Sequence, residues 1–274
     1  MPDRNFEIEM GLIVEAIYQR YHFDFRGYAQ ASLRRRLGTA MARFACESLS
    51  QLQHKLLHQE GFFPTLLDYL TVQVSEMFRD PGYFLALRRE VVPLLRTYPS
   101  LKVWVAGCST GEEAYSLAIL LREEGLLERT LIYATDINPQ ALQQAEAGVY
   151  DLDRIAGFTL NHQRAGGKSS LSDYYTAAYG RAVFDRNLRR HMVFSDHSLA
   201  TDSVFAEMQL VSCRNVLIYF DRTLQDRALG LFRDALCRKG FLGLGSKESL
   251  RFSAHTASFA DFVREERVFQ KVGP

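Results

Sequence analysis

The chain has 274 residues, of which 47% are hydrophobic and 24% charged, and its formal net charge is +1. This length allows one large domain and one small domain with a sizeable core, and the balanced charge argues against a general nucleic-acid binder. No apolar run approaches the ~18 residues of a membrane span and no signal segment is evident, so we expect a cytoplasmic protein without direct membrane insertion.

The first 70 residues show helical periodicity and no convincing strand. Apolar residues recur at three- and four-residue spacing at Ile13, Ile17 and Tyr21, and again at Leu33, Leu37, Met41 and Phe44. We therefore predict an all-helical N-terminal domain over residues 1–70.

From residue 103 onward, short apolar runs alternate with amphipathic helices. Strands are predicted at residues 103–106, 131–135, 192–194, 208–212 and 241–244, and helices at 112–124, 139–147 and 221–237. This alternation predicts an α/β fold with a mainly parallel sheet covered on both faces. The terminal run 267–271 is predicted to add an edge strand.

The interval from about 151 to 194 breaks this alternation. It is polar, contains Gly166-Gly167, and carries two apolar runs around residues 185–187. The pattern predicts a small β hairpin inserted into the sheet topology. The second domain would then span residues 71–274 and contain a small β insertion at about 151–194.

The four cysteines are far apart, at Cys46, Cys108, Cys213 and Cys237. Without a Cys-x-x-Cys pair, they indicate neither a zinc site nor a disulfide framework, and we expect no metal. Reduced thiols are consistent with a cytoplasmic location.

The first predicted strand breaks into a glycine turn, Gly107 to Gly111, that opens a helix, and Asp136 ends the next predicted strand. In open α/β sheets such a turn approaches a nucleoside, and the acidic residue accepts hydrogen bonds from ribose hydroxyls. The turn carries Glu112 and Glu113, where a pyrophosphate would need donors. A cationic nucleoside such as S-adenosylmethionine therefore fits better than a dinucleotide. The alternative is an ordinary strand end with Asp136 as a helix cap.

Four segments carry a family pattern, at residues 74–81, 106–113, 213–221 and 244–250, and the block Cys-Arg-Asn-Val-Leu-Ile-Tyr-Phe at 213–220 is the most specific of them. Together they resemble the chemotaxis receptor glutamate methyltransferases, the CheR family, over essentially the whole chain. The resemblance implies a helical N-terminal domain packed on a Rossmann-like, S-adenosylmethionine-dependent methyltransferase sheet with a small β insertion.

The resemblance also implies which residues contact the cofactor S-adenosylmethionine and its product S-adenosylhomocysteine. They are Gln73, Ser75, Arg79, Gly107, Glu113, Asp136, Ser198, Leu199, Arg214 and Asn215. Within this set Glu113 would lie near the methionine moiety, Asp136 at the ribose, and Ser198 beside the adenine. The chain departs from the family pattern at Gln73, Ser75 and Ser198, where the family usually has Asn, Thr and Asn. Amide and hydroxyl chemistry survive at the first two positions, whereas the third loses an amide.

The expected chemistry needs no general base. A glutamate side chain, with a reference pKa near 4.3, is already ionised at neutral pH when it attacks the sulfonium methyl group. A dry pocket that aligns the reactants can supply most of the acceleration. Arg79 and Tyr219 are the predicted aligners, because an arginine fork and a phenol can hold a carboxylate. The alternatives are a surface ion pair of Arg79 with Asp80 or Glu76, and a core role for Tyr219.

The helical domain carries a basic run at Arg34, Arg35, Arg36 and Arg43. If its apolar residues face the core, Arg36 and Arg43 fall on one flank of the helix and Arg35 points outward. A basic face on a neutral protein suits docking onto the acidic helical domain of a chemoreceptor, the partner that the resemblance implies. The alternative is an ordinary solvated face.

The sequence therefore predicts methylation of glutamate side chains on the cytoplasmic helices of chemoreceptors, as in adaptation during chemotaxis-type signal transduction. Two other functions stay open: a cofactor-binding module that docks on receptors without turnover, and a methyltransferase acting on a small molecule. An RNA acceptor is disfavoured because the charge is balanced and aromatic residues do not alternate with the basic run.

Overall fold

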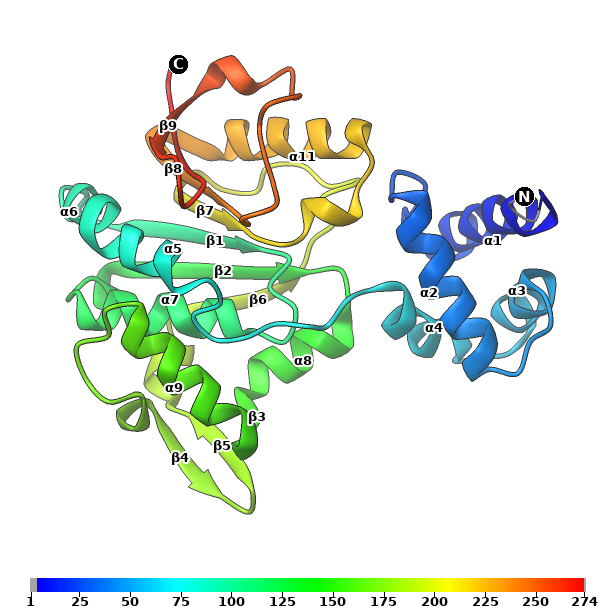
Figure 1. Cartoon of the computed structure of the whole chain (residues 1–274), viewed down its shortest axis with the longest axis horizontal. Helices are drawn as coiled ribbons and strands as arrows, with labels where there is room; N and C mark the ends of the chain where they lie inside the picture. The colour runs from blue at the N-terminus through cyan, green and yellow to red at the C-terminus, as the bar shows by residue number, and fades with distance from the viewer. Residues whose placement is uncertain (1–3, 274) are drawn as a thin grey trace.

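The computed structural model describes residues 4–273, which form a helical unit and an α/β unit joined by an extended segment (Figure 1). The helical unit comprises α1 (Arg4–Tyr21), α2 (Gln30–Arg43), α3 (Leu49–His58) and α4 (Phe62–Leu70). Its core contains the leucines at the predicted spacing, Leu33 and Leu37. None of the described helices is long and apolar enough to cross a membrane.

The α/β unit is built on a seven-stranded sheet with the order β6-β2-β1-β7-β8-β10-β9. Its strands are β1 (Leu101–Ala106), β2 (Thr130–Asp136), β6 (Met192–Asp196), β7 (Met208–Cys213), β8 (Leu236–Leu244), β9 (Phe259–Val263) and β10 (Val268–Lys271). The first five in sheet order are parallel, and β10 is antiparallel to both of its neighbours. This mixed sheet confirms the predicted α/β fold class.

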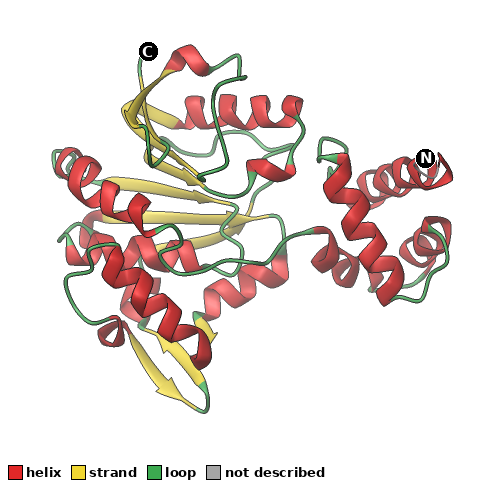
Figure 2. Ribbon diagram, in the orientation of Figure 1, coloured by secondary structure: helices red, strands yellow, loops and turns green. Residues whose placement is uncertain are grey.

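Helices cover both faces of the sheet (Figure 2). On one face lies α11 (Arg222–Ala235), and on the other lie α7 (Glu112–Glu123) and α8 (Pro139–Ala147). Further helices of this unit are α5 (Pro81–Ala86), a π-helical turn (Leu87–Val91), α6 (Val92–Leu95) and α9 (Ile155–Arg164). One apolar core is continuous from the helical unit to the α11 face, so the two units pack as one body on that side.

The C-terminal strand is not at the edge that the sequence predicted. It lies between β8 and β9, and β9 forms the edge of the sheet. The sequence pattern did not indicate β9, because its five residues, Phe-Ala-Asp-Phe-Val, do not alternate apolar and polar side chains.

A second, three-stranded antiparallel sheet, ordered β3-β5-β4, consists of β3 (Val149–Asp151), β4 (Tyr175–Ala178) and β5 (Arg181–Phe184). Its hairpin turns at Tyr179-Gly180, where both residues have positive φ, as a tight two-residue turn requires. The predicted turn at 185–187 is wrong. There Asp185 caps the short helix α10 (Arg186–Arg189), and the chain then enters the main sheet as β6.

A buried cluster of ion pairs connects the C-terminal end of α7 to the π-helical turn and to α9. The Arg88 guanidinium pairs with Glu123 and, at 3.1 Å, with Glu124, and His162 Nε2 lies 3.0 Å from Glu123 Oε1. Burial alone would raise the pKa of Glu123, but hydrogen bonds from His162 and Arg88 outweigh it and hold that pKa at about 2. Glu123 is therefore ionised in the folded protein over the neutral range.

We predict that Glu123→Gln lowers the free energy of unfolding by about 3 kcal/mol, because it removes one of the two carboxylates that neutralise the buried Arg88 guanidinium. Urea unfolding followed by circular dichroism measures the change. Glu128→Gln is the matched control, since Glu128 pairs with Arg190 on the surface and should cost less than about 1 kcal/mol.

The difference in the free energy of unfolding between the unmodified protein and Glu123→Gln should shrink in acid. A carboxyl whose folded pKa is depressed stabilises the fold above its unfolded pKa of about 4.5, and that contribution is lost as pH falls toward 2. Equal losses in Glu123→Gln and Glu128→Gln would contradict a structural role for the cluster.

Candidate functional site

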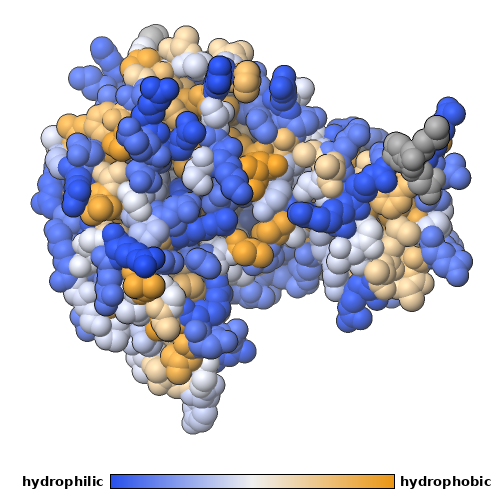
Figure 3. Space-filling model, viewed as in Figure 1, coloured by the Kyte–Doolittle hydropathy of each residue, from blue (hydrophilic) through white to orange (hydrophobic). Residues whose placement is uncertain are grey.

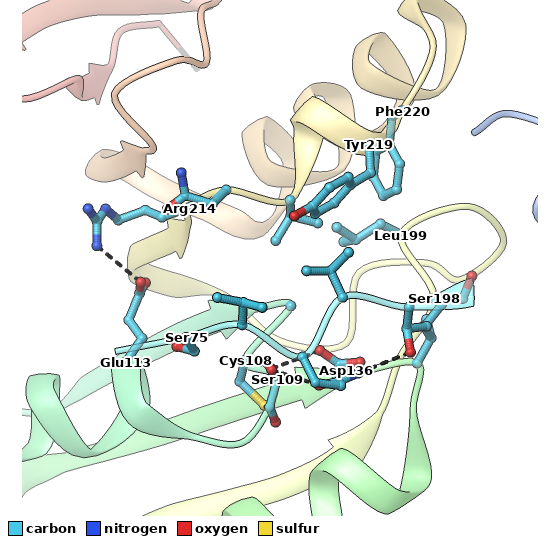
Figure 4. Close-up of a pocket in the computed structure, with 18 of the residues that line it drawn as sticks. Ser75, Cys108, Ser109, Glu113, Asp136, Ser198, Leu199, Arg214, Tyr219 and Phe220 are labelled. Atoms are coloured by element: carbon cyan, nitrogen blue, oxygen red, sulfur yellow. Dashed lines mark hydrogen bonds and ion pairs between the residues drawn. The ribbon is translucent and has the colours of Figure 1, made fainter. Parts of the chain in front are cut away.

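A cleft lies between the helical unit and the carboxyl edge of the parallel strands. Its volume is about 910 Å³, including space that is open to solvent. On the face shown in Figure 3, apolar side chains lie beside the hollow between the two units. The cleft is lined by every residue predicted to contact the cofactor and by the predicted aligner Tyr219: Gln73, Ser75, Arg79, Gly107, Glu113, Asp136, Ser198, Leu199, Arg214, Asn215 and Tyr219. Segments far apart in the sequence thus converge on one site (Figure 4).

The glycine turn after β1 forms the floor. Gly107 and Cys108 each donate a backbone hydrogen bond of 2.8 Å to the Thr135 carbonyl, which ties the turn to β2. Gly107 has φ +76°, and a Cβ there would lie 2.4 Å from a methyl group of Val216. Glycine is needed because the turn adopts a left-handed conformation directly beneath the 215–220 segment.

Asp136 stands at the end of β2 with its carboxylate held by two backbone donors. Ser109 N donates to Oδ2 at 2.8 Å and Asn138 N donates to Oδ1 at 3.0 Å. Burial raises the pKa of Asp136, and these N–H groups oppose the rise. A carboxylate fixed in this way can accept further hydrogen bonds from a pair of sugar hydroxyls.

Glu113, in the first turn of α7, occupies the opposite end of the cleft beside Arg214 (Figure 4). Its Oε2 lies 3.2 Å from Arg214 Nη1, and its Oε1 accepts a 2.6 Å hydrogen bond from the Ser212 hydroxyl. The other Arg214 nitrogen, Nη2, lies 2.7 Å from Asp80. A carboxylate next to a guanidinium is suited to a zwitterionic amino-acid group.

Ser198 and Leu199 form the wall beyond Asp136, where the loop after β6 begins. Ser198 N donates to the Asp202 carboxylate at 2.9 Å, and the Leu199 carbonyl accepts from Arg227. Together with Ile137 these residues offer one hydroxyl and an apolar surface that a flat base can cover.

The extended segment between the units crosses the cleft and is tied to it by side chains. Gln73 Oε1 accepts a 2.7 Å hydrogen bond from Ser109, and its amide nitrogen donates to Thr71. The Asn138 amide donates to both Asp68 and Thr71 at 2.9 Å. Thr71, Ser109 and Asn138 were not predicted as site residues, because their single polar groups form no recognisable pattern.

Arg36, predicted to lie on one flank of the helix as part of a basic docking face, is not available at the surface. It is 6% exposed, lines the cleft, and lies over the Tyr219 ring at 4.5 Å. Its Nη1 donates to the Leu70 carbonyl, while Nε and Nη2 are buried without a partner among the described residues. The cause is a short backbone pairing between the units, in which Ala29 N donates to the Tyr219 carbonyl at 2.8 Å. Tyr28, another unpredicted lining residue, takes part in the same pairing.

The two predicted aligners lie in the same cleft. Tyr219 points its hydroxyl into it (Figure 4). Arg79 is half-buried and pairs with neither Asp80 nor Glu76 among the described residues, so the surface ion pair considered for it is not formed. His197, which follows β6, packs edge-on against Trp104 and is placed 3.1 Å from the Ser203 carbonyl through Nε2.

Comparison with known proteins gives two family matches that cover most of the chain. The family model described as "CheR methyltransferase, SAM binding domain" matches residues 73–265, and "CheR methyltransferase, all-alpha domain" matches residues 8–71. Both domains of the predicted family are therefore present in this chain.

Relatives over nearly the full length carry related names. Cher3 of Pseudomonas putida, named as a methyltransferase, is 60% identical over 269 residues and 98% of both chains. A chemotaxis protein methyltransferase of Vibrio anguillarum is 30% identical over 81% of this chain and 82% of its own. Among solved structures, the N-methyltransferase NodS of Bradyrhizobium japonicum, in complex with S-adenosylhomocysteine, has a TM-score of 0.36 at 16% identity, over 71% of this chain and 70% of that one.

S-adenosylmethionine is accordingly the cofactor, and the chemistry of the cleft fits it. The cleft offers one carboxylate beside a guanidinium for an amino acid, a second carboxylate for sugar hydroxyls, and an apolar wall for a base. These are the three parts of S-adenosylmethionine, in the order in which Glu113, Asp136 and Ser198 follow one another along the cleft (Figure 4).

We predict that Asp136→Ala weakens binding of S-adenosylhomocysteine by about 1 to 3 kcal/mol, because two hydrogen bonds from ribose hydroxyls to a charged acceptor are lost. Isothermal titration calorimetry measures the affinity. The control is Asp196→Ala, which removes the exposed carboxylate opposite Asp136 in the β2–β6 register and should leave affinity unchanged. Unchanged affinity in folded Asp136→Ala would exclude the ribose assignment.

Proposed function

The chain belongs to the CheR methyltransferase family, and we propose that it transfers a methyl group from S-adenosylmethionine to glutamate side chains on the cytoplasmic helices of a chemoreceptor. Methyltransferase chemistry and a place in chemotaxis follow from the family and from its relatives. The observation that supports the glutamate acceptor is that two arginines, Arg36 and Arg79, line the cofactor cleft without an ion pair among the described residues.

Arg36 and Arg79 make the cleft selective for an anionic acceptor. A buried guanidinium without a carboxylate partner gives the cleft wall a positive charge, which favours an anionic acceptor through Coulomb attraction. Arg79 lines the same cleft without an ion pair among the described residues, so its planar fork is free to hold a carboxylate. Neither arginine would help to bind a neutral or cationic small molecule.

The proposed reaction needs alignment and not proton transfer. When bound, S-adenosylmethionine supplies an electrophilic methyl group on a sulfonium. We propose that Glu113 holds its ammonium, Asp136 its ribose, and Ser198 and Leu199 its adenine. The remaining predicted contacts, which close the site around it, are Gln73, Ser75, Arg79, Gly107, Arg214 and Asn215. Tyr219 and Arg79 then orient the acceptor carboxylate near the positive charge of Arg36. This carboxylate is ionised at neutral pH and needs no base.

The basic face available for docking is smaller than predicted. Arg34 pairs with Glu7 and lies over Phe6, and Arg36 is buried, whereas Arg35 and Arg43 are exposed on α2. We propose that Arg35 and Arg43 attract the acidic helices of the receptor, which would place this protein in the cytoplasm.

Incubation with labelled S-adenosylmethionine and membranes that contain the organism's own receptors tests the proposal. Base-labile methyl ester on a receptor band is expected. Label on a small molecule, or cofactor binding without any labelled product, would favour one of the two rival functions.

We predict that Arg79→Lys slows methyl transfer to the receptor about 10- to 100-fold, because lysine keeps the charge but loses the planar fork that aligns a carboxylate. Single-turnover kinetics at saturating cofactor measure the step. Arg89→Lys, at an exposed position on the π-helical turn, is the control and should match the unmodified protein. A wild-type rate in Arg79→Lys would remove the aligning role.

We also predict that docking and cofactor binding are separable. Changing both Arg35 and Arg43 to Glu should slow receptor methylation, and the reaction of the unmodified protein should slow as salt rises, since exposed charges are screened beyond about 8 to 10 Å. Affinity for S-adenosylhomocysteine should not change. Arg238→Glu with Lys239→Glu makes the same charge change at the exposed start of β8 and should have little effect. Equal effects of the two double variants would mean that only net charge matters.

A further inference from the structure

We propose that Tyr83 and Ser212 form a buried hydrogen-bond relay that positions Glu113 and thereby sets the affinity for the amino-acid end of the cofactor. This inference rests on the proposed role of Glu113 as the partner of the ammonium group. It concerns two residues that do not line the cleft and that form no motif with it.

The direction of the relay follows from the proton count. Ser212, fully buried on β7, donates its hydroxyl proton to Glu113 Oε1 at 2.6 Å, because an ionised carboxylate can only accept. Tyr83 Oη lies 2.8 Å from Ser212 Oγ. Since the serine proton is already used, the tyrosine must be the donor of that second bond. The chain of donation therefore runs from Tyr83 through Ser212 to Glu113.

A glycine on the neighbouring strand makes room for the relay. Gly243 on β8 lies opposite Ser212 in the parallel register, and a Cβ there would lie 2.1 Å from Tyr83 Oη. The Tyr83 phenol therefore contacts the backbone of Gly243 directly, next to Ser212. Glycine weakens a strand interior, and its usual reason for being there is the close approach of another group. Here that group is the Tyr83 side chain, which α5 supplies just after Arg79.

The relay acts on one carboxylate oxygen, and Arg214 acts on the other. Arg214 Nη1 lies 3.2 Å from Glu113 Oε2, and the same guanidinium lies over the Tyr83 ring at 4.3 Å. Glu113 is consequently held at both oxygens before any ligand arrives. A carboxylate fixed in this way meets a cation without first losing rotamer freedom, which increases affinity.

Tyr83 is suited to a permanent donor role. Burial raises the pKa of its phenol, Glu113 raises it further, and Arg214 opposes the rise. The phenol therefore keeps its proton at all physiological pH values. The relay is accordingly a fixed structural element.

Two ligands that differ in one end of the cofactor test this role. S-adenosylhomocysteine carries the amino acid, whereas 5′-methylthioadenosine has the same adenosine thioether without it. Calorimetry on the full chain should show that Ser212→Ala and Tyr83→Phe each weaken S-adenosylhomocysteine roughly 3- to 30-fold. Affinity for 5′-methylthioadenosine should stay within about twofold, because the relay acts only on Glu113.

Two control variants separate positioning from packing. Tyr115→Phe removes another buried tyrosine hydroxyl, bonded to the Ala145 carbonyl and not to Glu113, and should change neither affinity. Ser212→Thr keeps the hydroxyl and should restore most of the preference for S-adenosylhomocysteine. Parallel losses for both ligands in Ser212→Ala and Tyr83→Phe would overturn the relay in favour of general packing.

Glu113→Gln identifies which assignment fails. If this variant keeps the normal preference for S-adenosylhomocysteine, Glu113 does not hold the ammonium and the relay is overturned with it. If the preference for S-adenosylhomocysteine falls in Ser212→Ala, Tyr83→Phe and Glu113→Gln, the relay is supported. This conclusion holds even if the protein methylates no receptor in the separate labelling experiment. That last outcome would count against the glutamate acceptor alone.

Discussion

The site depends on a short backbone pairing between the two units, residues 27–29 with 219–221. Asp221 N donates to the Gly27 carbonyl and Ala29 N to the Tyr219 carbonyl, both at 2.8 Å, and the Tyr28 and Phe220 rings pack 5.0 Å apart. Because α2 starts directly after this pairing, Arg36 is carried over Tyr219 and into the cleft. The helical unit therefore builds one wall of the reaction site, in addition to the docking role proposed for its exposed arginines.

Charges are divided along the cleft in a way that suits two oppositely charged reactants. The carboxylates of Glu113 and Asp136 belong to the α/β unit, whereas the unpaired guanidiniums of Arg36 and Arg79 come from the helical unit and the segment that follows it. A cationic cofactor and an anionic acceptor would each meet the opposite sign on the unit that binds it. Transfer of a methyl cation between them neutralises both, so groups already in place need not reorganise.

Sequence reasoning succeeded where chemistry and backbone geometry coincide. Parallel strands must end at one edge, so Gly107 after β1 and Asp136 after β2 could be placed together from their spacing and residue types alone. Sequence reasoning failed where contacts between segments far apart in the sequence decide whether a side chain is buried or which strand lies at the edge. The helical period placed Arg36 beside the core but could not distinguish solvent from a second unit, and the terminal run at 267–271 could not show that β9 would take the edge.

The same reasoning explains why the supporting residues were missed. Groups that touch the cofactor need a particular chemistry at a particular turn, which leaves a pattern in the sequence. Groups that hold them need only one donor or acceptor within reach, as Ser109 does for Gln73 and Ser212 does for Glu113. A serine of this kind is indistinguishable in the sequence from any other small buried residue. Its contribution becomes visible only when the proton of each hydroxyl is assigned a direction in the folded site.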